Sequence, residues 1–363
     1  MRVVQWNRRS LGCLFVLLFL LTNPGKSPKP DSYGFSISPH DYSDVDFIDP
    51  THGWIVVNDR TKDHFQLFRT SDGGKNWQTS RTPDGLISVC FITPQLGWAL
   101  KFRRAAAEDL FLLRTVDGGR TWSQQSSPPV VLGVSLDNPL GLAFLDAKHG
   151  WITALGNLGA SLVGTSDGGK TVQELKNPSP VIQNYGGIRA FSGAGVWIFG
   201  DGFVLRSEDL GASWNNPIDS QVLNINPNLF EINSVEFVNG AGWMVGHTGQ
   251  GIILASSDFG HHWKVSLAAD DDMNVQSVAA WDRNHACALG AGTSRSTTMF
   301  CTEDGGARWN KREGVFNATL EQANFFQRFV MLKSGSGWAL RAGGYLYHTL
   351  DGGRSWKPLD LIE

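Results

Sequence analysis

The carboxylates with the most regular spacing in this sequence are seven aspartates, each inside an eight-residue segment of the form Thr/Ser-x-Asp-x-Gly-x-x-Trp, with Val replacing Trp in the third copy. They are Asp72, Asp117, Asp167, Asp209, Asp258, Asp304 and Asp351, and successive ones lie 45, 50, 42, 49, 46 and 47 residues apart. A carboxylate can act as a general acid or base, or it can accept hydrogen bonds from the backbone of a turn. Seven near-copies cannot all form one active site. The motif therefore predicts a structural turn, and no catalytic residue is assigned.

Basic residues that could bind an anionic partner lie in two loops of the first third of the chain. Arg60 and Lys62 belong to the first loop, and Lys101, Arg103 and Arg104 to the second. Because the loops occupy equivalent places in adjacent repeats, we expect their side chains to lie near one another. Such a patch could hold an acidic or C-terminal segment of a protein partner. The alternative is that these charges are simply solvated.

Other groups that could do chemistry lack the spacing that the chemistry needs. The three adjacent carboxylates of 270–272 do not alternate as the ligands of a calcium loop do, and His261 and His262 have no ligand-spaced partner. No metal site and no cofactor is therefore predicted. Asn317 begins an Asn-x-Thr glycosylation sequon, which matters only in a eukaryotic secretory pathway.

The segments around each aspartate define the elements that must position it. Upstream of most copies lie two short apolar stretches, the second of which contains a small residue followed by Trp, as in Gly53-Trp54 and Gly97-Trp98. A further extended stretch follows each copy. A period of this length filled with short strands indicates a repeat architecture. We predict an all-β, seven-bladed β-propeller with four antiparallel strands per blade, and with the aspartate segment as the hairpin between strands three and four.

The tryptophan of the second strand also predicts the strand register. If it faces the residue immediately before the aspartate segment, the pairs are Trp54/Arg69, Trp98/Arg114, Trp151/Gly164, Trp197/Arg206, Trp243/Ala255 and Trp338/His348. Three pairs place Arg opposite Trp, where a guanidinium could stack on the indole. Extension of these arginines into solvent is the alternative.

The sixth repeat lacks this tryptophan and has Cys287 in its place, while Cys301 occupies the facing position. Facing residues of antiparallel strands have Cα separations that a disulfide can bridge. We therefore predict a Cys287–Cys301 disulfide. Cys90 has no partner in this scheme and is interpreted as a small buried hydrophobic residue.

The N-terminus has the features of an export signal. Arg2, Arg8 and Arg9 precede an apolar run of 11 residues, 11–21, which is short for a membrane span. We expect residues 1–26 to be a signal peptide or an N-terminal anchor, 27–42 a linker or N-terminal extension, and 43–363 the propeller. The chain would then be periplasmic or extracellular, with membrane proximity possible through its N-terminal segment. Its formal net charge of −3 argues against general nucleic-acid affinity.

The aspartate segment resembles the Asp-box, or bacterial neuraminidase repeat, of sialidases, sortilin-type receptors and some glycoside hydrolases. The fuller unit, Val-x-Phe, then Gly-Trp, then Arg/His-Thr-x-Asp-Gly-Gly-Arg-x-Trp, is most similar to the exported photosystem II stability and assembly factor family over about residues 43–363. This resemblance implies a non-catalytic scaffold that binds a protein client. We expect the chain to be a monomer. The alternative is a carbohydrate-binding protein or a glycoside hydrolase or sialidase-like enzyme, which needs an arginine cluster or two carboxylates flanking the scissile bond.

Overall fold

The computed structural model describes residues 40–59, 64–103, 109–125, 141–156, 159–176, 178, 186–200, 202–219, 231–269, 273–292, 297–313, 315–316, 326–341, 345–359 and 361. The chain divides into two compact units, Met1–Ile37 and Ser38–Glu363, and every described residue belongs to the second. Strands and turns make up this described part, and it contains no helix. The first strand begins at His40, inside the segment 27–42 that we predicted to be a linker.

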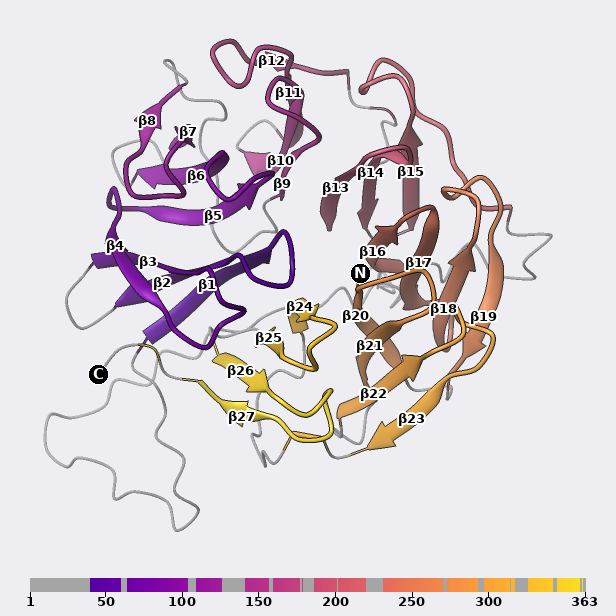
Figure 1. Cartoon of the computed structure of the whole chain (residues 1–363). Coiled ribbons are helices and arrows are strands. Elements are labelled where there is room, and N and C mark those ends of the chain that lie inside the picture. The colour runs from indigo at the N-terminus through magenta and orange to yellow at the C-terminus, as the bar shows by residue number, and fades with distance from the viewer. Residues whose placement is uncertain are drawn as a thin grey trace, which may run out of the picture. The chain divides into compact units, whose positions relative to one another are not determined.

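Seven antiparallel sheets follow one another along the chain, each with its strands in sequence order (Figure 1). Blades one to three contain β1 (His40–Phe47), β2 (Gly53–Asp59), β3 (His64–Thr70) and β4 (Gln78–Arg81); β5 (Leu86–Phe91), β6 (Gly97–Arg103), β7 (Asp109–Thr115) and β8 (Ser123–Gln124); and β9 (Gly141–Phe144), β10 (Gly150–Gly156), β11 (Gly159–Thr165) and β12 (Gln173–Glu174). Blades four and five contain β13 (Gly187–Phe191), β14 (Gly195–Gly200) and β15 (Phe203–Ser207); and β16 (Glu231–Val238), β17 (Ala241–His247), β18 (Gly251–Ser256) and β19 (Lys264–Ala268). Blades six and seven contain β20 (Asn274–Ala280), β21 (Ala286–Ala291), β22 (Thr297–Thr302) and β23 (Asn310–Glu313); and β24 (Phe326–Met331), β25 (Gly337–Arg341), β26 (Tyr345–Thr349) and β27 (Lys357–Pro358).

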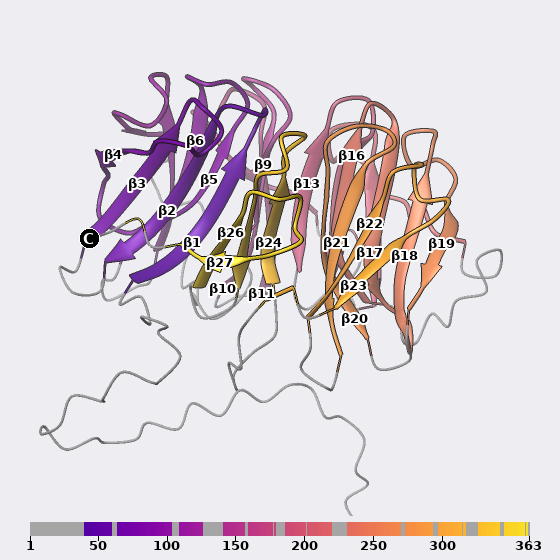
Figure 2. The same cartoon turned by 60° about the horizontal axis from the view of Figure 1, so that its bottom comes forward.

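The blades close into a ring, because the first strand of each contacts the next blade and β24 of the seventh contacts β1 of the first. The predicted seven-bladed β-propeller is therefore confirmed. The fourth blade differs in its outermost element, where a single bridge between Arg206 and Asn215 replaces a fourth strand. Figure 2 shows the turns after the third strands gathered at one end of the ring, its upper end in that view. We call these turns, which contain the seven aspartates, the box turns, and this end of the ring the box end.

Stacked aromatic rings fill the spaces between blades. Trp54 stacks on Phe91 of the next blade and Trp98 on Phe144, in both cases with 3.7 Å between ring centroids. In four blades the glycine before the tryptophan makes room for the phenylalanine of its own blade: a Cβ at Gly53 would lie 2.3 Å from the Phe47 ring, and Gly97, Gly150 and Gly242 have the same kind of neighbour. This contact explains the Gly-Trp step, because any larger residue would displace an aromatic ring from the core.

The predicted strand register is confirmed for all six tryptophans. Each blade tryptophan is the Cα partner of the residue that the sequence placed opposite it. Three of these indole N–H groups also tie a blade to the next one: Trp54 Nε1 donates to the carbonyl of Gly118 at 3.1 Å, Trp98 Nε1 to that of Gly168 at 2.9 Å, and Trp151 Nε1 to that of Leu210 at 3.3 Å. In these three blades, burial of the ring and hydrogen bonding of its N–H group both favour tryptophan at this position.

In the sixth blade the two cysteines replace such a pair. Cys287 and Cys301 are Cα partners, as the register required. Their sulfur atoms lie 2.12 Å apart in a disulfide that crosses the middle of the sheet. Both residues are buried. The covalent bond takes the position at which the other blades place a tryptophan.

Candidate functional site

The carboxylates of the seven box turns bind their own backbone. In the first turn Asp72 Oδ1 accepts hydrogen bonds from the Thr70 hydroxyl at 2.8 Å and from the Asn76 N–H at 3.0 Å, while the Thr70 hydroxyl accepts one from the Gly74 N–H at 2.9 Å. The same hydroxyl-to-carboxylate bond occurs at Asp117, Asp167, Asp209, Asp258, Asp304 and Asp351. Hydrogen bonds from the Asn76 side chain and backbone lower the pKa of Asp72 to about 2. Asp72 is therefore held as an anion, unsuited to donating a proton near neutral pH.

Two of these turns depart from the glycine pattern. Leu210 and Phe259 occupy the place of the first glycine in the fourth and fifth turns and have φ values of 61° and 62°. Large L-residues rarely adopt this left-handed conformation. The Phe259 ring covers Gly193 and Gly240, where an added Cβ would lie 3.0 Å and 2.9 Å from its atoms. Packing over these glycines accounts for the conformation at Phe259.

Most of the basic patch predicted from the sequence lies outside the described residues. Arg60, Lys62 and Arg104 are not described, and of Arg103 only the backbone, at the end of β6, is. Lys101 lies on β6 and is half-buried. The described strands that precede these two loops, β2 and β6, end opposite the box turns. The patch remains a prediction.

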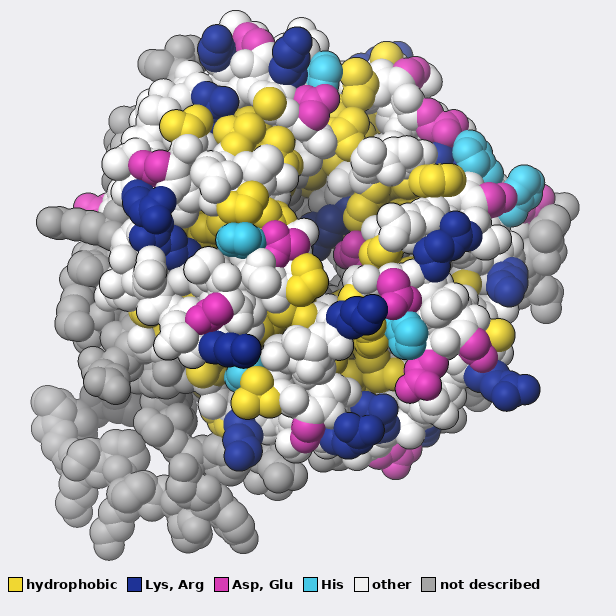
Figure 3. All heavy atoms as spheres, viewed as in Figure 1, with side chains coloured by type: hydrophobic (Ala, Val, Ile, Leu, Met, Phe, Trp, Pro, Cys, Tyr) yellow, Lys and Arg dark blue, Asp and Glu magenta, His cyan; other side chains and the backbone are white. Residues whose placement is uncertain are grey.

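A second cationic surface lies at the box end, between the second and third blades. It is a groove of about 500 Å³ lined by Arg114, Gln125, Ala147, Lys148, Ser166, Asp167, Gly168 and Lys170. Lysine and arginine side chains are visible in this region in Figure 3, which views the box end. The carboxylate of Asp167 is already engaged by the hydroxyls of Thr165 and Thr171 at 3.0 Å and 2.7 Å. No ion pair joins Arg114, Lys148 or Lys170 to another described residue. The sequence argument missed this groove because its lining comes from two separate repeats.

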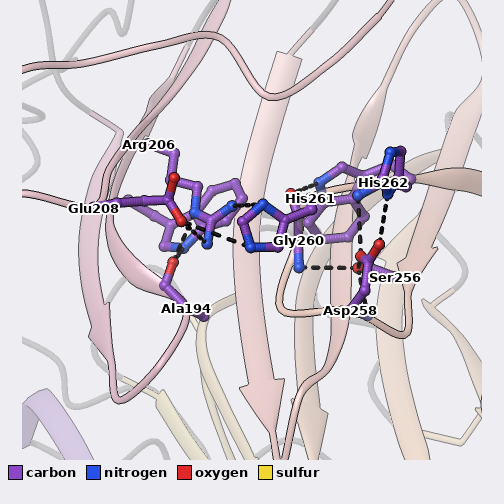
Figure 4. A network of polar contacts seen from close by, with 10 residues as sticks. Ala194, Arg206, Glu208, Ser256, Asp258, Gly260, His261 and His262 are labelled. Atoms are coloured by element: carbon purple, nitrogen blue, oxygen red, sulfur yellow. Dashed lines mark hydrogen bonds and ion pairs between the residues drawn. The ribbon is translucent and has the colours of Figure 1, made fainter.

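At the seam between the fourth and fifth blades, the corresponding arginine has its own partners (Figure 4). Arg206 is buried, and its Nε donates to the carbonyl oxygen of Ala194 at 2.9 Å. Its Nη2 lies 2.9 Å from Glu208 Oε1, and its Nη1 lies 3.3 Å from His261 Nδ1. The guanidinium also stacks over Trp197, 5.4 Å from the ring centroid. Stacking therefore occurs at Arg206 and at Arg114, whose Cζ lies 5.9 Å from the Trp98 centroid.

The axis of the ring carries a cluster of charged groups that sequence analysis did not identify. Asp44 and Asp46 lie on β1, Arg189 on β13, Glu236 on β16 and Arg328 on β24, the first strands of four blades. Asp44 is buried and accepts hydrogen bonds from Arg328 Nε at 3.0 Å, from the Ser88 hydroxyl at 2.8 Å and from the Val89 N–H at 3.0 Å. One carboxylate thus joins the seventh, first and second blades.

Burial dominates the electrostatics of this axial cluster. It raises the pKa of Asp46 to about 6 and that of Glu236 to about 7, although Arg328 and Arg189 oppose the shifts. Burial likewise lowers the pKa of Arg189 to about 10. Carboxyl groups that titrate near neutral pH are candidates for proton transfer or for a switch of charge. Asp46 and Glu236 are the middle residues of Val-x-Phe segments. The sequence analysis used only the flanking valine and phenylalanine, and so it did not identify them.

Cys90 faces the same axis from β5. Its side chain is half-buried and packs against the hydrophobic core of the second and third blades, in keeping with its interpretation as a small hydrophobic residue. Burial and the nearby Asp46 carboxylate raise the pKa of the Cys90 thiol to about 12. A thiol held protonated in this way is a poor nucleophile and a poor metal ligand.

The other candidate groups from the sequence are an acidic segment, a sequon and two histidines. Residues 270–272 and Asn317 lie outside the described part of the chain. His261 and His262 are exposed on the fifth box turn, and His262 Nδ1 lies 2.6 Å from Asp258 Oδ2. Within the described ranges, no group of three or more His, Cys, Asp or Glu side chains is arranged to hold a metal ion. The same ranges contain no helix long and apolar enough to cross a bilayer.

Comparison with known proteins connects this geometry to one family. The sequence profile described as "Photosynthesis system II assembly factor YCF48" matches residues 265–363. No curated protein matches the sequence. The solved structure "YCF48 bound to D1 peptide" superposes with a TM-score of 0.55 and 21% identity over 85% of this chain and 91% of that one. YCF48 from Cyanidioschyzon merolae gives 0.55 and 17% over 86% and 95%.

A third similar structure is the extracellular domain of a putative hybrid two component system, BT4673 from B. thetaiotaomicron. It has a TM-score of 0.53 and 12% identity, covering 84% of this chain and 37% of that one. At these identities the structural likeness shows the fold alone. Together with the profile match, it confirms the resemblance drawn from the sequence: the chain is a β-propeller of the neuraminidase-repeat type, similar to photosystem II assembly factors.

Proposed function

We propose that this chain is an exported, non-catalytic scaffold that binds an acidic segment of a protein client. One YCF48 structure of the same fold is described as bound to a D1 peptide, which supports a peptide or protein as the kind of ligand. The client of this chain need not be the same protein. Export to a periplasmic or extracellular space and a monomeric state belong to the same proposal, as does membrane proximity through residues 1–26.

The observation that carries the proposal is the groove between the second and third blades. Three cations line it, and none has an ion-pair partner among the described residues. The chain as a whole has a formal net charge of −3, so these cations stand out locally from an acidic protein. A local excess of positive charge attracts acidic segments and speeds their association. The patch predicted from the sequence, Arg60, Lys62, Lys101, Arg103 and Arg104, is a second candidate surface.

Crosslinking in the native compartment, followed by mass spectrometry, tests the proposal directly because it identifies the client. Two charge-removal variants then distinguish the surfaces: Lys148→Gln with Lys170→Gln for the groove, and Arg103→Ala with Arg104→Ala for the patch. Capture should weaken in one of them and lose part of its salt dependence. If both variants capture the client as the unmodified chain does, neither surface is the binding site.

Fractionation and determination of the mature N-terminus test the export part. A chain that stays in the cytoplasm with residues 1–26 intact would contradict it.

A glycoside hydrolase or carbohydrate-binding protein is the second candidate function, and the axial carboxylates favour it. Asp46 and Glu236 have the raised pKa values that a general acid needs. A screen with fluorogenic sialosides and β-glucans tests this alternative. Turnover that disappears in Glu236→Gln or Asp46→Asn would replace the scaffold proposal by an enzymatic one.

A further inference from the structure

Arg114 and Arg206 occupy the same place in two different blades. Each precedes a box turn, each is the Cα partner of a blade tryptophan, and each guanidinium stacks on that indole. Their surroundings differ most clearly in charge, because a carboxylate lies beside Arg206 and no described carboxylate pairs with Arg114.

At the fourth blade the carboxylate comes from the chain itself. Glu208 is the second residue of the box turn, and its Oε1 lies 2.9 Å from Arg206 Nη2 and 3.7 Å from His261 Nε2 (Figure 4). His261 is the sixth residue of the next box turn. One carboxylate oxygen therefore bridges an arginine of one blade and a basic side chain of the next. Charge-assisted contacts of this kind are the usual mode of carboxylate recognition by arginine.

At the second blade the equivalent carboxylate is missing. The second residue of that box turn is Val116, which is 62% exposed, and the sixth residue of the next turn is Lys170. Arg114 Nε is buried and has no hydrogen-bond partner. Arg114 and Lys170 line the groove, and Lys148 adds a third cation. The groove thus repeats the basic half of the Arg206 arrangement without its acidic half.

We propose that the groove binds a carboxylate of the client in the position that Glu208 occupies at Arg206. This inference rests on the proposed function and assigns its chemistry: a carboxylate oxygen bridges Arg114 and Lys170, with Lys148 as an additional counter-charge. An Asp or Glu side chain and a C-terminal carboxylate present the same group. Arg206 itself is excluded as a binding group, because Glu208 already neutralises it.

The decisive variant supplies the missing carboxylate internally. Val116→Glu places an acidic side chain where the fourth blade has Glu208. The new carboxylate should occupy the groove and compete with the carboxylate of the ligand. Val116→Gln is the matched control, since it has nearly the same size and no charge. Val116 is largely exposed, so neither change disturbs the core.

The probes are three peptides of an acetylated tetra-alanine: the free C-terminal acid, its amide, and an amide with one internal Glu. Binding is followed by chemical-shift changes of the backbone amides of residues 165–170, at low ionic strength and with the full exported chain. Unmodified protein and Val116→Gln should respond to an acid-bearing peptide and not to the plain amide. Preference for the first or the third peptide identifies the source of the carboxylate.

Val116→Glu should weaken the response by about tenfold, which corresponds to the loss of one charge-assisted contact, ~1.4 kcal/mol. Equal binding by Val116→Glu and Val116→Gln, or no response of the unmodified protein to either acid, overturns the inference. Its failure is distinguishable from that of the proposed function: if the native client is still captured by Val116→Glu, the scaffold role stands and uses another surface.

Discussion

At the scale of single residues, surroundings decide what a side chain does. Asp117 lies in a surface turn. The slight burial of its carboxylate raises the pKa, but hydrogen bonds from the side chain and backbone of Thr121 outweigh this effect and lower the pKa to about 2. Asp46 accepts one hydrogen bond, from the Phe91 N–H, and burial raises its pKa to about 6. The same residue type is thus a fixed anion in one place and a titrating group in another.

Removing one box carboxylate should weaken its turn. We expect Asp117→Ala to lower the free energy of unfolding by about 1 kcal/mol, because the Thr121 N–H and the hydroxyls of Thr115 and Thr121 lose their acceptor. Since the folded pKa is depressed, the carboxylate's contribution is present above its ordinary pKa and is lost as the pH falls towards 2. Urea unfolding at pH 7 and at pH 2 measures both effects. A difference between Asp117→Ala and the unmodified chain that is as large at pH 2 as at pH 7 would contradict this assignment.

At the scale of one element, the sixth blade replaces an aromatic contact with a covalent one. Its sheet β20–β23 has Cys287 and Cys301 where other blades have a tryptophan and its partner. Both positions face the core cluster that also contains Met299 and Phe329. A disulfide between facing strands fixes their register independently of how well the smaller side chains fill the space.

Reduction should therefore destabilise this blade. The cysteines are 14 residues apart in the chain, and closing a loop of this size is worth about 3 kcal/mol in the chain-entropy model. Unfolding with and without dithiothreitol measures the effect, and a Cys287→Ala, Cys301→Ala double variant is the control, since reductant should not change it. Recovery of two alkylatable thiols at these positions from protein isolated under oxidising conditions would exclude the bond.

At the scale of the whole molecule, the ring closes without exchanging a strand. The first blade takes its strands from one continuous segment, as does the seventh, so the seam between them depends on side chains. Phe47 stacks on Trp338 with 4.2 Å between centroids, and Arg328 pairs with Asp44. Because Asp44 also binds Ser88 and Val89, this one carboxylate holds three blades at the axis.

Asp44→Asn should open that seam more readily. Removing one partner of a buried ion pair leaves the other uncompensated and typically costs about 3–5 kcal/mol. We expect faster hydrogen exchange in β1, β5 and β24, measured by mass spectrometry. Asp304→Asn, the same change in an exposed turn, is the control and should act only locally. Uniform protection across all seven blades in Asp44→Asn would show that the seam does not depend on this pair.

The axial cluster also predicts how stability depends on pH. The groups that face Glu236 are Arg189, Arg328 and Asp46, with the Phe237 backbone N–H. Because burial raises the folded pKa of Glu236 to about 7, its stabilising contribution is present below pH 4 and is lost as the pH rises to about 7. Asp46 acts in the same direction up to about pH 6.

Glu236→Gln should therefore gain stability relative to the unmodified protein between pH 5 and pH 8. Thermal unfolding across this range is the measurement, and Asp46→Asn should show the same sign over a lower range. A Glu236→Gln variant whose stability relative to the unmodified protein is independent of pH would contradict the raised pKa.

The amino-acid sequence by itself determined the number of blades, the strand order and the pairing of each blade tryptophan. Residues equivalent to Gly53, Trp54 and Asp72 recur because the blades have the same local requirements. The aspartate stabilises a tight turn, the glycine leaves room for an aromatic ring, and the tryptophan fills the gap between blades. A pattern that recurs seven times can be interpreted without coordinates. The Cys287–Cys301 pairing followed from the same repeat, since it was inferred from the place where the tryptophan is missing.

Only the tertiary structure decided where the charges meet. Arg189 and Glu236 are each the Cα partner of their blade tryptophan, so they occupy equivalent positions with opposite charges. They become neighbours of each other and of Arg328 because the ring brings every first strand to one axis. The contrast between Arg114 and Arg206 depends likewise on the side chain that the next blade contributes. Sites of this kind differ from blade to blade, so they leave no periodic signal in the sequence. Their charged groups become neighbours only when the blades close into a ring.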